Sequence, residues 1–322
     1  MPARSLALAG VAGLAFAALA LPARAETLSV LSFNIYWGAT LTEDSLERTV
    51  AVIEESGADV VGIQEKMTFD ERGEAFAVNS AQEIARRLGW QMVDQTREND
   101  GAWSHSAILT RLPVDRLAAN EMCVTLTTPA APVRFCNLHL MSAPYQPYQL
   151  LHIPYRDAPL LDTAEEAIRA AEETRGAAID ALAEDLAEGG DLPTILVGDF
   201  NEPSHLDWTQ AAADAGLHPI AVAFPTTRRL EELGFRDAYR TLHPDEVARP
   251  GHTWTPTTSA DDPQDHHDRI DFVLFRGSRI DLRDASVLGE AGPMTDVAME
   301  PWPSDHRAVL AVFEVTAPAN GR

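Results

Sequence analysis

Six short apolar runs in this sequence, each typical of a buried β-strand, carry an acid, an amide or an imidazole within them or at their edge. The polar residues at these places are Asn34, Glu65, His139, Asp199 with Asn201, Asp271, and Asp305 with His306. Strand ends that meet at one rim of two packed sheets would collect such side chains in a single cleft. The pattern therefore favours a fold in which packed sheets build the site.

Each of these residues also has an ordinary structural explanation. An Asp or Asn after a strand is commonly a turn residue or a helix cap, and a histidine inside an apolar run, such as His139, is commonly a core residue. The repeated occurrence of the pattern favours the functional interpretation for the set. Oxygen ligands with one or two imidazoles suit Mg²⁺, Mn²⁺ or Ca²⁺ better than a zinc cage.

Strand-like runs and helical segments are interleaved along the chain. The expected strands are Thr27–Ile35, Asp59–Gln64, Ser106–Thr110, Glu121–Leu126, Val133–Leu140, Thr194–Val197, Arg269–Phe275, Arg279–Leu288 and Ala308–Val315. The expected helices are Glu43–Ser56, Ala77–Leu88 and Thr163–Glu188. Because no linker or repeat divides the chain, we expect one α/β domain over residues 26–322, with two sheets packed face to face and helices outside.

The first 25 residues have the composition of a secretory signal. Arg4 precedes an apolar run from Leu6 to Leu21, and Ala23-Arg24-Ala25 has the small residues of a cleavage site. A buried or membrane helix is the alternative, but the run is short for a span, and no later segment is apolar enough. The sequence therefore predicts a secreted or periplasmic protein, without stable membrane insertion.

Cys123 and Cys136 are the only cysteines. They lie in two β-like runs joined by the turn-forming residues Thr127–Pro132, so a hairpin could bring them face to face. In a chain bound for an oxidising compartment this favours a disulfide, and two buried thiols are the alternative.

The chain is strongly acidic, with a formal net charge of −24, and Lys66 is its only lysine. A surface of this sign disfavours tight, non-specific binding of nucleic acid through a basic face. It does not exclude a nuclease whose positive charge comes from bound metal. Solubility in a salty habitat explains the acidity equally well.

Seven short motifs resemble, in order, those of the endonuclease/exonuclease/phosphatase superfamily, the deoxyribonuclease-like fold. They are Ser32-Phe33-Asn34-Ile35, Ile63-Gln64-Glu65, Ser106-Ala107-Ile108-Leu109, Asn137-Leu138-His139-Leu140, Gly198-Asp199-Phe200-Asn201, Arg269-Ile270-Asp271-Phe272 and Ser304-Asp305-His306. The resemblance covers nearly all of residues 26–322. It implies a four-layer α/β sandwich of two packed mixed β-sheets flanked by helices, with the site at one end of the sheets.

The resemblance also implies a role for each site residue. Glu65 would be the principal metal carboxylate, and Asn34 and Asp305 would help to hold the ion or its waters. The implied ion is Mg²⁺, with Mn²⁺ or Ca²⁺ as alternatives.

The remaining five residues would act on the substrate. By resemblance, Asp199 would orient or deprotonate the attacking water, and Asn201 would hold a phosphoryl oxygen. His306 would lie against the phosphate with its tautomer set by Asp271, and His139 would donate to the phosphate.

Two segments are candidate specificity elements. Met141–Tyr155 carries three tyrosines that could contact a substrate or could pack on the sandwich. Gly251–Asp268 contains Thr253-Trp254, which the resemblance places at the mouth of the site. His266 and His267 in the same segment could bind an extra ion, although adjacent strand residues point in opposite directions, and a solvated loop is favoured.

Departures from the family pattern are also visible. Tyr36 stands where some nuclease relatives carry a second metal-binding acid, and the carboxylate that would support His139 cannot be located. His105 is either a cleft residue or a surface loop residue.

The sequence thus predicts a monomeric, metal-dependent phosphoesterase that hydrolyses a phosphodiester or a phosphomonoester by in-line attack of water. Its substrate would be a small molecule or nucleic acid. An extracellular nuclease and a sphingomyelinase-like phospholipase remain as alternatives, because a fold does not choose among chemistries. A metal-dependent binding protein or a Ca²⁺-binding surface protein on the same fold is the non-enzymatic alternative, although Glu65, Asp199 and His306 are all present.

Overall fold

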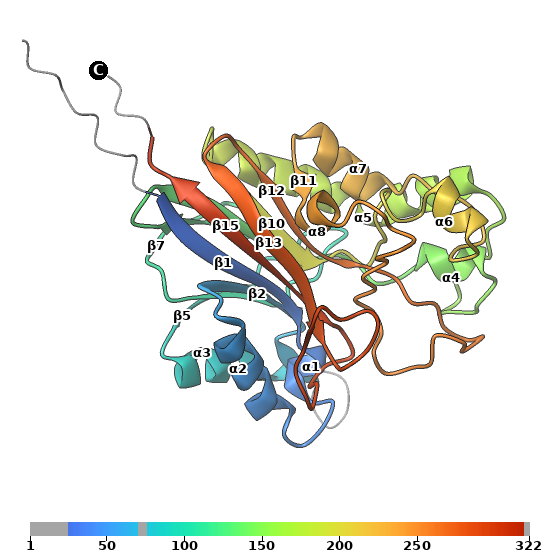
Figure 1. Ribbon diagram of the computed structural model, residues 1–322, viewed down its shortest axis with the longest axis horizontal. Coiled ribbons are helices and arrows are strands. Elements are labelled where there is room, and N and C mark those ends of the chain that lie inside the picture. The colour runs from blue at the N-terminus through green and yellow to red at the C-terminus, as the bar shows by residue number, and fades with distance from the viewer. Residues whose placement is uncertain (1–24, 70–75, 319–322) are drawn as a thin grey trace, which may run out of the picture.

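The computed structural model describes residues 25–69 and 76–318 (Figure 1). The predicted signal segment lies outside these residues except for Ala25, which begins the first strand and pairs with Thr316.

Two mixed sheets form the centre of the molecule. The seven-stranded sheet has the order β14 (Val297–Ala298), β13 (Ile280–Gly289), β15 (Ala308–Thr316), β1 (Ala25–Asn34), β2 (Val60–Gln64), β6 (Ser106–Thr110) and β5 (Gln91–Gln95). The six-stranded sheet has the order β11 (Arg236–Asp237), β12 (Asp271–Arg276), β10 (Thr194–Asp199), β9 (Pro132–His139), β8 (Cys123–Thr127) and β7 (Val114–Leu117). A separate pair consists of β3 (Met67–Phe69) and β4 (Phe76–Asn79).

The described residues contain eight helices. They are α1 (Tyr36–Ala39), α2 (Ser45–Ser56), α3 (Ser80–Leu88), α4 (Gln146–Leu150), α5 (Ala164–Glu188), α6 (Gln210–Asp214), α7 (Pro225–Glu232) and α8 (Ala238–Leu242). In Figure 1, α2 and α3 lie on the side of β1 and β2, and α5 and α7 lie on the opposite side of the molecule. No helix among the described residues is long and apolar enough to cross a membrane.

The period of two along each strand divides the core into layers. In β1, Leu28 and Val30 face the other sheet, whereas Leu31 and Phe33 face α2 and α3. The six-stranded sheet packs its outer face on α5 and α7 in the same way. The four-layer α/β sandwich with two mixed sheets is therefore confirmed.

The predicted elements match the structure closely, with one correction. Helix α3 begins at Ser80 rather than at Ala77, because the Asn79 side chain accepts a hydrogen bond from the backbone of Gln82 and caps the helix there. The strands β3, β4, β5, β7, β11 and β14 and the helices α1, α4, α6, α7 and α8 were not predicted. All are short, and β5 and β7 are also only partly buried.

The expected disulfide is present. Cys123 and Cys136 are direct partners in the antiparallel β8–β9 pair, and a bond joins their sulfur atoms. The bridge lies in the core layer beneath α5, within the six-stranded sheet that carries part of the site.

Candidate active site

Three of the predicted polar residues form one row across the six-stranded sheet. Asp199, at the end of β10, is in register with His139 of β9 on one side and with Asp271 of β12 on the other. All three lie on the face of the sheet that Phe135, Val197 and Val273 turn toward the space between the sheets. At this end of the two sheets, the space between them is therefore lined by polar side chains instead of apolar ones.

Asn34 reaches this row from the opposite sheet. Its side-chain amide donates to Oδ2 of Asp199 at 2.9 Å and to Oε1 of Glu65 at 3.2 Å, and lies 3.4 Å from Nε2 of His306. Because β1 and β10 belong to different sheets, this amide ties the two halves of the sandwich together at the site. The two sheets approach closely here, since a Cβ on Gly62 in β2 would lie 2.4 Å from the Val197 side chain.

Glu65 stands just beyond β2 in a left-handed backbone conformation, with φ +57°. This conformation is costly for a residue other than glycine and needs support from its surroundings. The backbone of Trp37 donates to Oε2 of Glu65 at 2.8 Å. The neighbouring Lys66 is buried, and its ammonium donates to the carbonyls of Gln95 and Ser106 at 2.9 Å. Lys66 thus anchors the backbone that presents Glu65.

The Glu65 and Asp305 carboxylates fit a divalent cation. Burial and the nearby charge of Asp305 raise the pKa of Glu65, and burial and the charge of Asp271 raise the pKa of Asp305. Among the described residues, Oδ1 of Asp305 is buried without a hydrogen-bond partner. Hard oxygen donors whose negative charges repel one another are the donor set that Mg²⁺ or Mn²⁺ satisfies.

Tyr36 adds no carboxylate to this set. Burial and the charges of Asp305 and Glu65 raise the pKa of its phenol group.

His306 and Asp271 form a buried pair. Nδ1 of His306 lies 2.9 Å from Oδ2 of Asp271, and the backbone N–H of Asp271 donates to the Thr253 hydroxyl at 3.0 Å. Burial opposes a charge on the imidazole, but the carboxylates of Asp271 and Asp199 outweigh it and raise the pKa of His306 well above its ordinary value. The ring is therefore cationic at neutral pH, with Nε2 directed toward Asn34 and Asp199.

Asp199 is a buried carboxylate at the end of β10. Burial and the charge of Asp271 raise its pKa to about 7, although His306 and hydrogen bonds from Asn34 and the Asn201 backbone oppose the shift. Asn201 has φ +48°, and its side chain donates to Oδ2 of Asp199 at 3.3 Å and to the Leu140 carbonyl at 3.0 Å. A carboxyl group with a pKa near neutrality can accept a proton from a water molecule.

His139 lies beside Asp199 but is neutral. Burial, with the charges of His306 and His105, lowers its pKa to about 3. Its Nε2 lies 3.5 Å from Oδ2 of Asp199, and neither ring nitrogen has a hydrogen-bond partner among the described residues. Asp199 is therefore the carboxylate nearest to Nε2. The charge of the neighbouring His105 contributes to the lowered pKa of the ring.

The structure brings all eight predicted residues together. The set comprises Asn34, Glu65, His139, Asp199, Asn201, Asp271, Asp305 and His306. Two contributors were missed as positioning residues. Ser304 donates to the Asn34 carbonyl at 2.6 Å and accepts from the backbone of His306 at 3.1 Å, which its place in Ser-Asp-His could have suggested. Lys66 could have been found as the only lysine, directly after Glu65.

The tyrosines of Met141–Tyr155 are mainly packing residues. Tyr145 and Tyr148 are 4% and 7% exposed, and the Tyr145 hydroxyl donates to Asp268 at 2.7 Å. With Trp254 they line a recess of about 40 Å³ that also touches Asn201. Only a small part of each ring is available to a substrate.

His266 and His267 do not face a common point. Nε2 of His267 lies 2.9 Å from the Thr258 hydroxyl, whereas Nε2 of His266 lies 3.1 Å from Nδ1 of His218. Adjacent residues diverge here as expected, so a metal shared by these two histidines is not supported by the structure.

Comparisons with known proteins agree with this architecture. The sequence model of the Endonuclease/Exonuclease/phosphatase family matches residues 31–306, which include every candidate residue. An uncharacterised Caenorhabditis elegans protein, F14F9.5, is 27% identical over 309 residues, covering 89% of this chain and 91% of the relative.

Solved structures show the same fold at low identity. A humanised D. rerio TDP2 has a TM-score of 0.51 and 15% identity, covering 89% of this chain and 98% of that one. A protein of the same family from Beutenbergia cavernae has a TM-score of 0.50 and 16% identity, covering 91% and 72%.

Proposed function

The chain belongs to the endonuclease/exonuclease/phosphatase family, and from this premise we propose that it is an exported, divalent-metal-dependent phosphodiesterase. In this proposal, water attacks the phosphorus in line with the departing oxygen. Asn34, Glu65 and Asp305 hold the cation, and His139, Asp199, Asn201, Asp271 and His306 act on the substrate and the water.

The observation that carries the proposal is the convergence at the Asn34 amide. This one group contacts Glu65 of the metal-binding side and Asp199 of the hydrolytic side, and lies against His306. Hydrolysis of a phosphate ester needs a placed water, neutralisation of the phosphoryl oxygens and help for the leaving group within a few ångströms. The site contains a group suited to each task.

His306 supplies fixed positive charge. Its Nδ1 is committed to Asp271, so Nε2 is the atom that faces the substrate. A cationic imidazole held in this way stabilises the negative charge that builds on the phosphoryl oxygens in the transition state. It needs no reorientation during the reaction.

Asp199 is the group proposed to hold and deprotonate the water. Its Oδ2 accepts from Asn34 at 2.9 Å, and its Oδ1 accepts from the backbone of Asn201 at 2.8 Å, so the carboxylate is fixed on both sides. Its raised pKa suits proton transfer near neutral pH. The neutral His139 lies beside it, with an imidazole N–H for a phosphoryl oxygen. Asn201 also lies beside it and would hold a phosphoryl oxygen by releasing one of its two amide hydrogen bonds, to Asp199 or to the Leu140 carbonyl.

A bound divalent cation would supply neutralisation of the phosphoryl and leaving-group oxygens. Glu65 and Asp305 would be its carboxylate ligands, with the Asn34 oxygen beside them. Binding would also relieve the repulsion that raises the pKa of Glu65 in its absence.

A phosphodiester is the favoured substrate class, with nucleic acid as one source. A D. rerio TDP2 of the same fold, with a TM-score of 0.51, was solved in complex with a single-strand DNA product. The net charge of −24 favours a short or single-stranded ligand over a long duplex, because the surface repels extended phosphate backbones. The leader-like first 25 residues and the disulfide support export, since disulfides persist in oxidising compartments.

The test is hydrolysis of bis-p-nitrophenyl phosphate, p-nitrophenyl phosphate, plasmid DNA and sphingomyelin, each with Mg²⁺, Mn²⁺, Ca²⁺ or EDTA. We expect metal-dependent cleavage of a diester by the wild type and its collapse in His306→Ala. Equal rates for both proteins, unaffected by EDTA on all four substrates, would contradict the proposal and favour a binding protein.

A further inference from the structure

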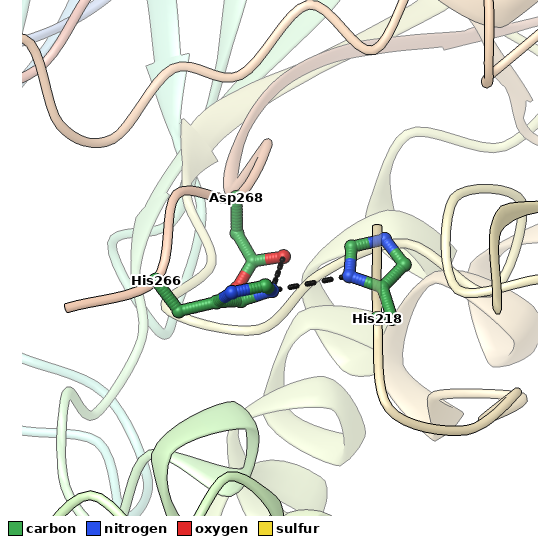
Figure 2. Close-up of side chains that lie close together, drawn as sticks. All are labelled: His218, His266 and Asp268. Carbon is green, nitrogen blue, oxygen red and sulfur yellow. Dashed lines mark hydrogen bonds and ion pairs between the residues drawn. The ribbon is translucent and has the colours of Figure 1, made fainter. Parts of the chain in front are cut away.

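A second cluster of metal-ligating side chains lies outside the catalytic set. His218 follows α6, whereas His266 and Asp268 belong to the loop before β12, and Figure 2 shows the three side chains turned toward one another. Nδ1 of His218 lies 3.1 Å from Nε2 of His266, which lies 3.8 Å from Oδ1 of Asp268. One ligand atom from each of the three lies within 4.8 Å of the other two.

We propose that His218, His266 and Asp268 form a binding site for a divalent transition-metal ion of the Zn²⁺ type, separate from the oxygen-rich catalytic site. The ligand atoms would be Nδ1 of His218, Nε2 of His266 and Oδ1 of Asp268, with a water molecule in the fourth position. Two imidazoles with one carboxylate suit Zn²⁺, whereas Mg²⁺ and Ca²⁺ prefer oxygen ligands.

The spacing fits tetrahedral coordination. With metal–ligand bonds of about 2.1 Å, neighbouring ligand atoms of a tetrahedral zinc site lie about 3.4 Å apart. The observed 3.1 Å and 3.8 Å lie on either side of that value, and the remaining pair of ligand atoms, from His218 and Asp268, lies within 4.8 Å. Side-chain rotations that draw this pair together would complete the geometry.

The surroundings hold the ligands in place. Asp268 is 1% exposed, and it accepts from the Trp208 indole N–H at Oδ1, 2.8 Å, and from the Tyr145 hydroxyl at Oδ2, 2.7 Å. The carboxylate keeps a free lone pair on Oδ1 for an ion. His218 stacks on Trp208, with centroids 4.2 Å apart, and forms a hydrogen bond with the backbone of Asp207. Such partners orient metal ligands and set the histidine tautomer.

Such an ion would act as a clamp beside the active site. Asp268 pairs through its backbone with Trp254, and Trp254 pairs with His306. An ion joining His218 to this loop would restrain the segment that leads to the catalytic histidine. The alternative is a plain hydrogen bond between the two imidazoles, in which one ring donates and the other accepts.

The test counts the two sites separately. The chelator-treated full chain carrying Glu65→Gln, which lacks the main catalytic metal ligand, is titrated with Zn²⁺ by calorimetry and with Co²⁺ by visible absorption. We expect one equivalent of Zn²⁺ to bind and Co²⁺ to develop the absorption bands of a tetrahedral site. If the Glu65→Gln protein binds no Zn²⁺ and develops no such bands with Co²⁺, the proposal is overturned.

Adding single substitutions to Glu65→Gln identifies the ligands. His218→Gln and His266→Gln keep a polar side chain of similar reach and should abolish the bound equivalent, whereas His267→Gln in the same loop should retain it. Tyr145→Phe should weaken Zn²⁺ binding by about 10- to 100-fold, because it frees the orientation of Asp268. Unchanged affinity in both His218→Gln and His266→Gln would place the ion elsewhere and overturn the assignment.

Discussion

Nδ1 of His306 lies 2.9 Å from Oδ2 of Asp271, and both side chains are buried where the two sheets open. The pair links the last motif of the sequence to β12 and directs Nε2 of His306 toward Asp199. In the proposed mechanism, this hydrogen bond acts on catalysis by fixing the tautomer and orientation of His306.

Asp271→Asn should therefore lower kcat by about 10³-fold or more while the protein stays folded, since an amide can stabilise the wrong tautomer and adds no negative charge. Steady-state kinetics on bis-p-nitrophenyl phosphate with saturating Mg²⁺ would measure the effect. Asp284→Asn, at an exposed position of β13, is the matched control and should be silent. A loss below tenfold in Asp271→Asn would refute the role given to this pair.

Glu65→Gln should make the metal-free protein more stable at pH 8. Burial raises the pKa of Glu65 in the folded state, so ionising the carboxyl costs stability, and this cost grows as the pH rises above the pKa of the unfolded chain. In EDTA the variant should melt at a higher temperature than the wild type at pH 8, with a smaller difference at pH 5. Mg²⁺ or Mn²⁺ should raise the Tm of the wild type and leave the variant nearly unchanged. Equal responses of the two proteins to metal would remove Glu65 as a ligand.

His139 should make the fold sensitive to acid. Its pKa is lowered to about 3, so the stability that depends on the neutral ring is complete above the ordinary pKa of 6.5 and is lost as the pH falls from there toward 3. Each pKa unit corresponds to about 1.4 kcal/mol. Urea unfolding at several pH values should show a shallower acid decline for His139→Asn than for the wild type. His152→Asn, at an exposed loop position, should follow the wild-type curve, and a parallel curve for His139→Asn would count against this account.

Lys66→Met should destabilise the protein by about 3 kcal/mol or more, because it leaves a set of buried acceptors without their donor. The ammonium is bound by the Gln95 and Ser106 carbonyls and pairs with Asp94. Urea unfolding would measure the loss. Arg111→Met removes an exposed ion pair with Asp59 and should cost about 1 kcal/mol or less. Similar small losses in both variants would show that Lys66 does not support the backbone of Glu65.

The local sequence predicted a strand or helix correctly where the apolar pattern or the capping residues were clear. The apolar alternation of β1 and β10 predicted strands, and the Thr163–Glu188 segment became a helix with a capping box at its start. The signal was weak in β5 and β7, because these strands are only five and four residues long and mostly polar, which is too little for an apolar run or a clear alternation.

The candidate site was predictable for a related reason. Asn34, His139, Asp199 and Asp271 continue the inward-facing alternation of their strands, so a polar residue at such a position is conspicuous in the sequence. Their convergence followed from the strand ends and from the order of the motifs. The structure gathers the eight residues that the sequence nominated and adds Ser304 and Lys66 as positioning residues.

The sequence by itself determined which residues are polar at strand ends, which segments can pair, and that the two cysteines occupy neighbouring strands. Only the tertiary structure decided that Asn34 bridges Glu65 and Asp199, and that Lys66 is buried next to Glu65. It also decided that the partner of His266 is the distant His218 and not the adjacent His267. The reason is physical. Periodicity along a strand or helix is a local property of the chain, whereas contacts across 48 residues between His218 and His266, or 165 between Asn34 and Asp199, depend on how the sheets and loops pack.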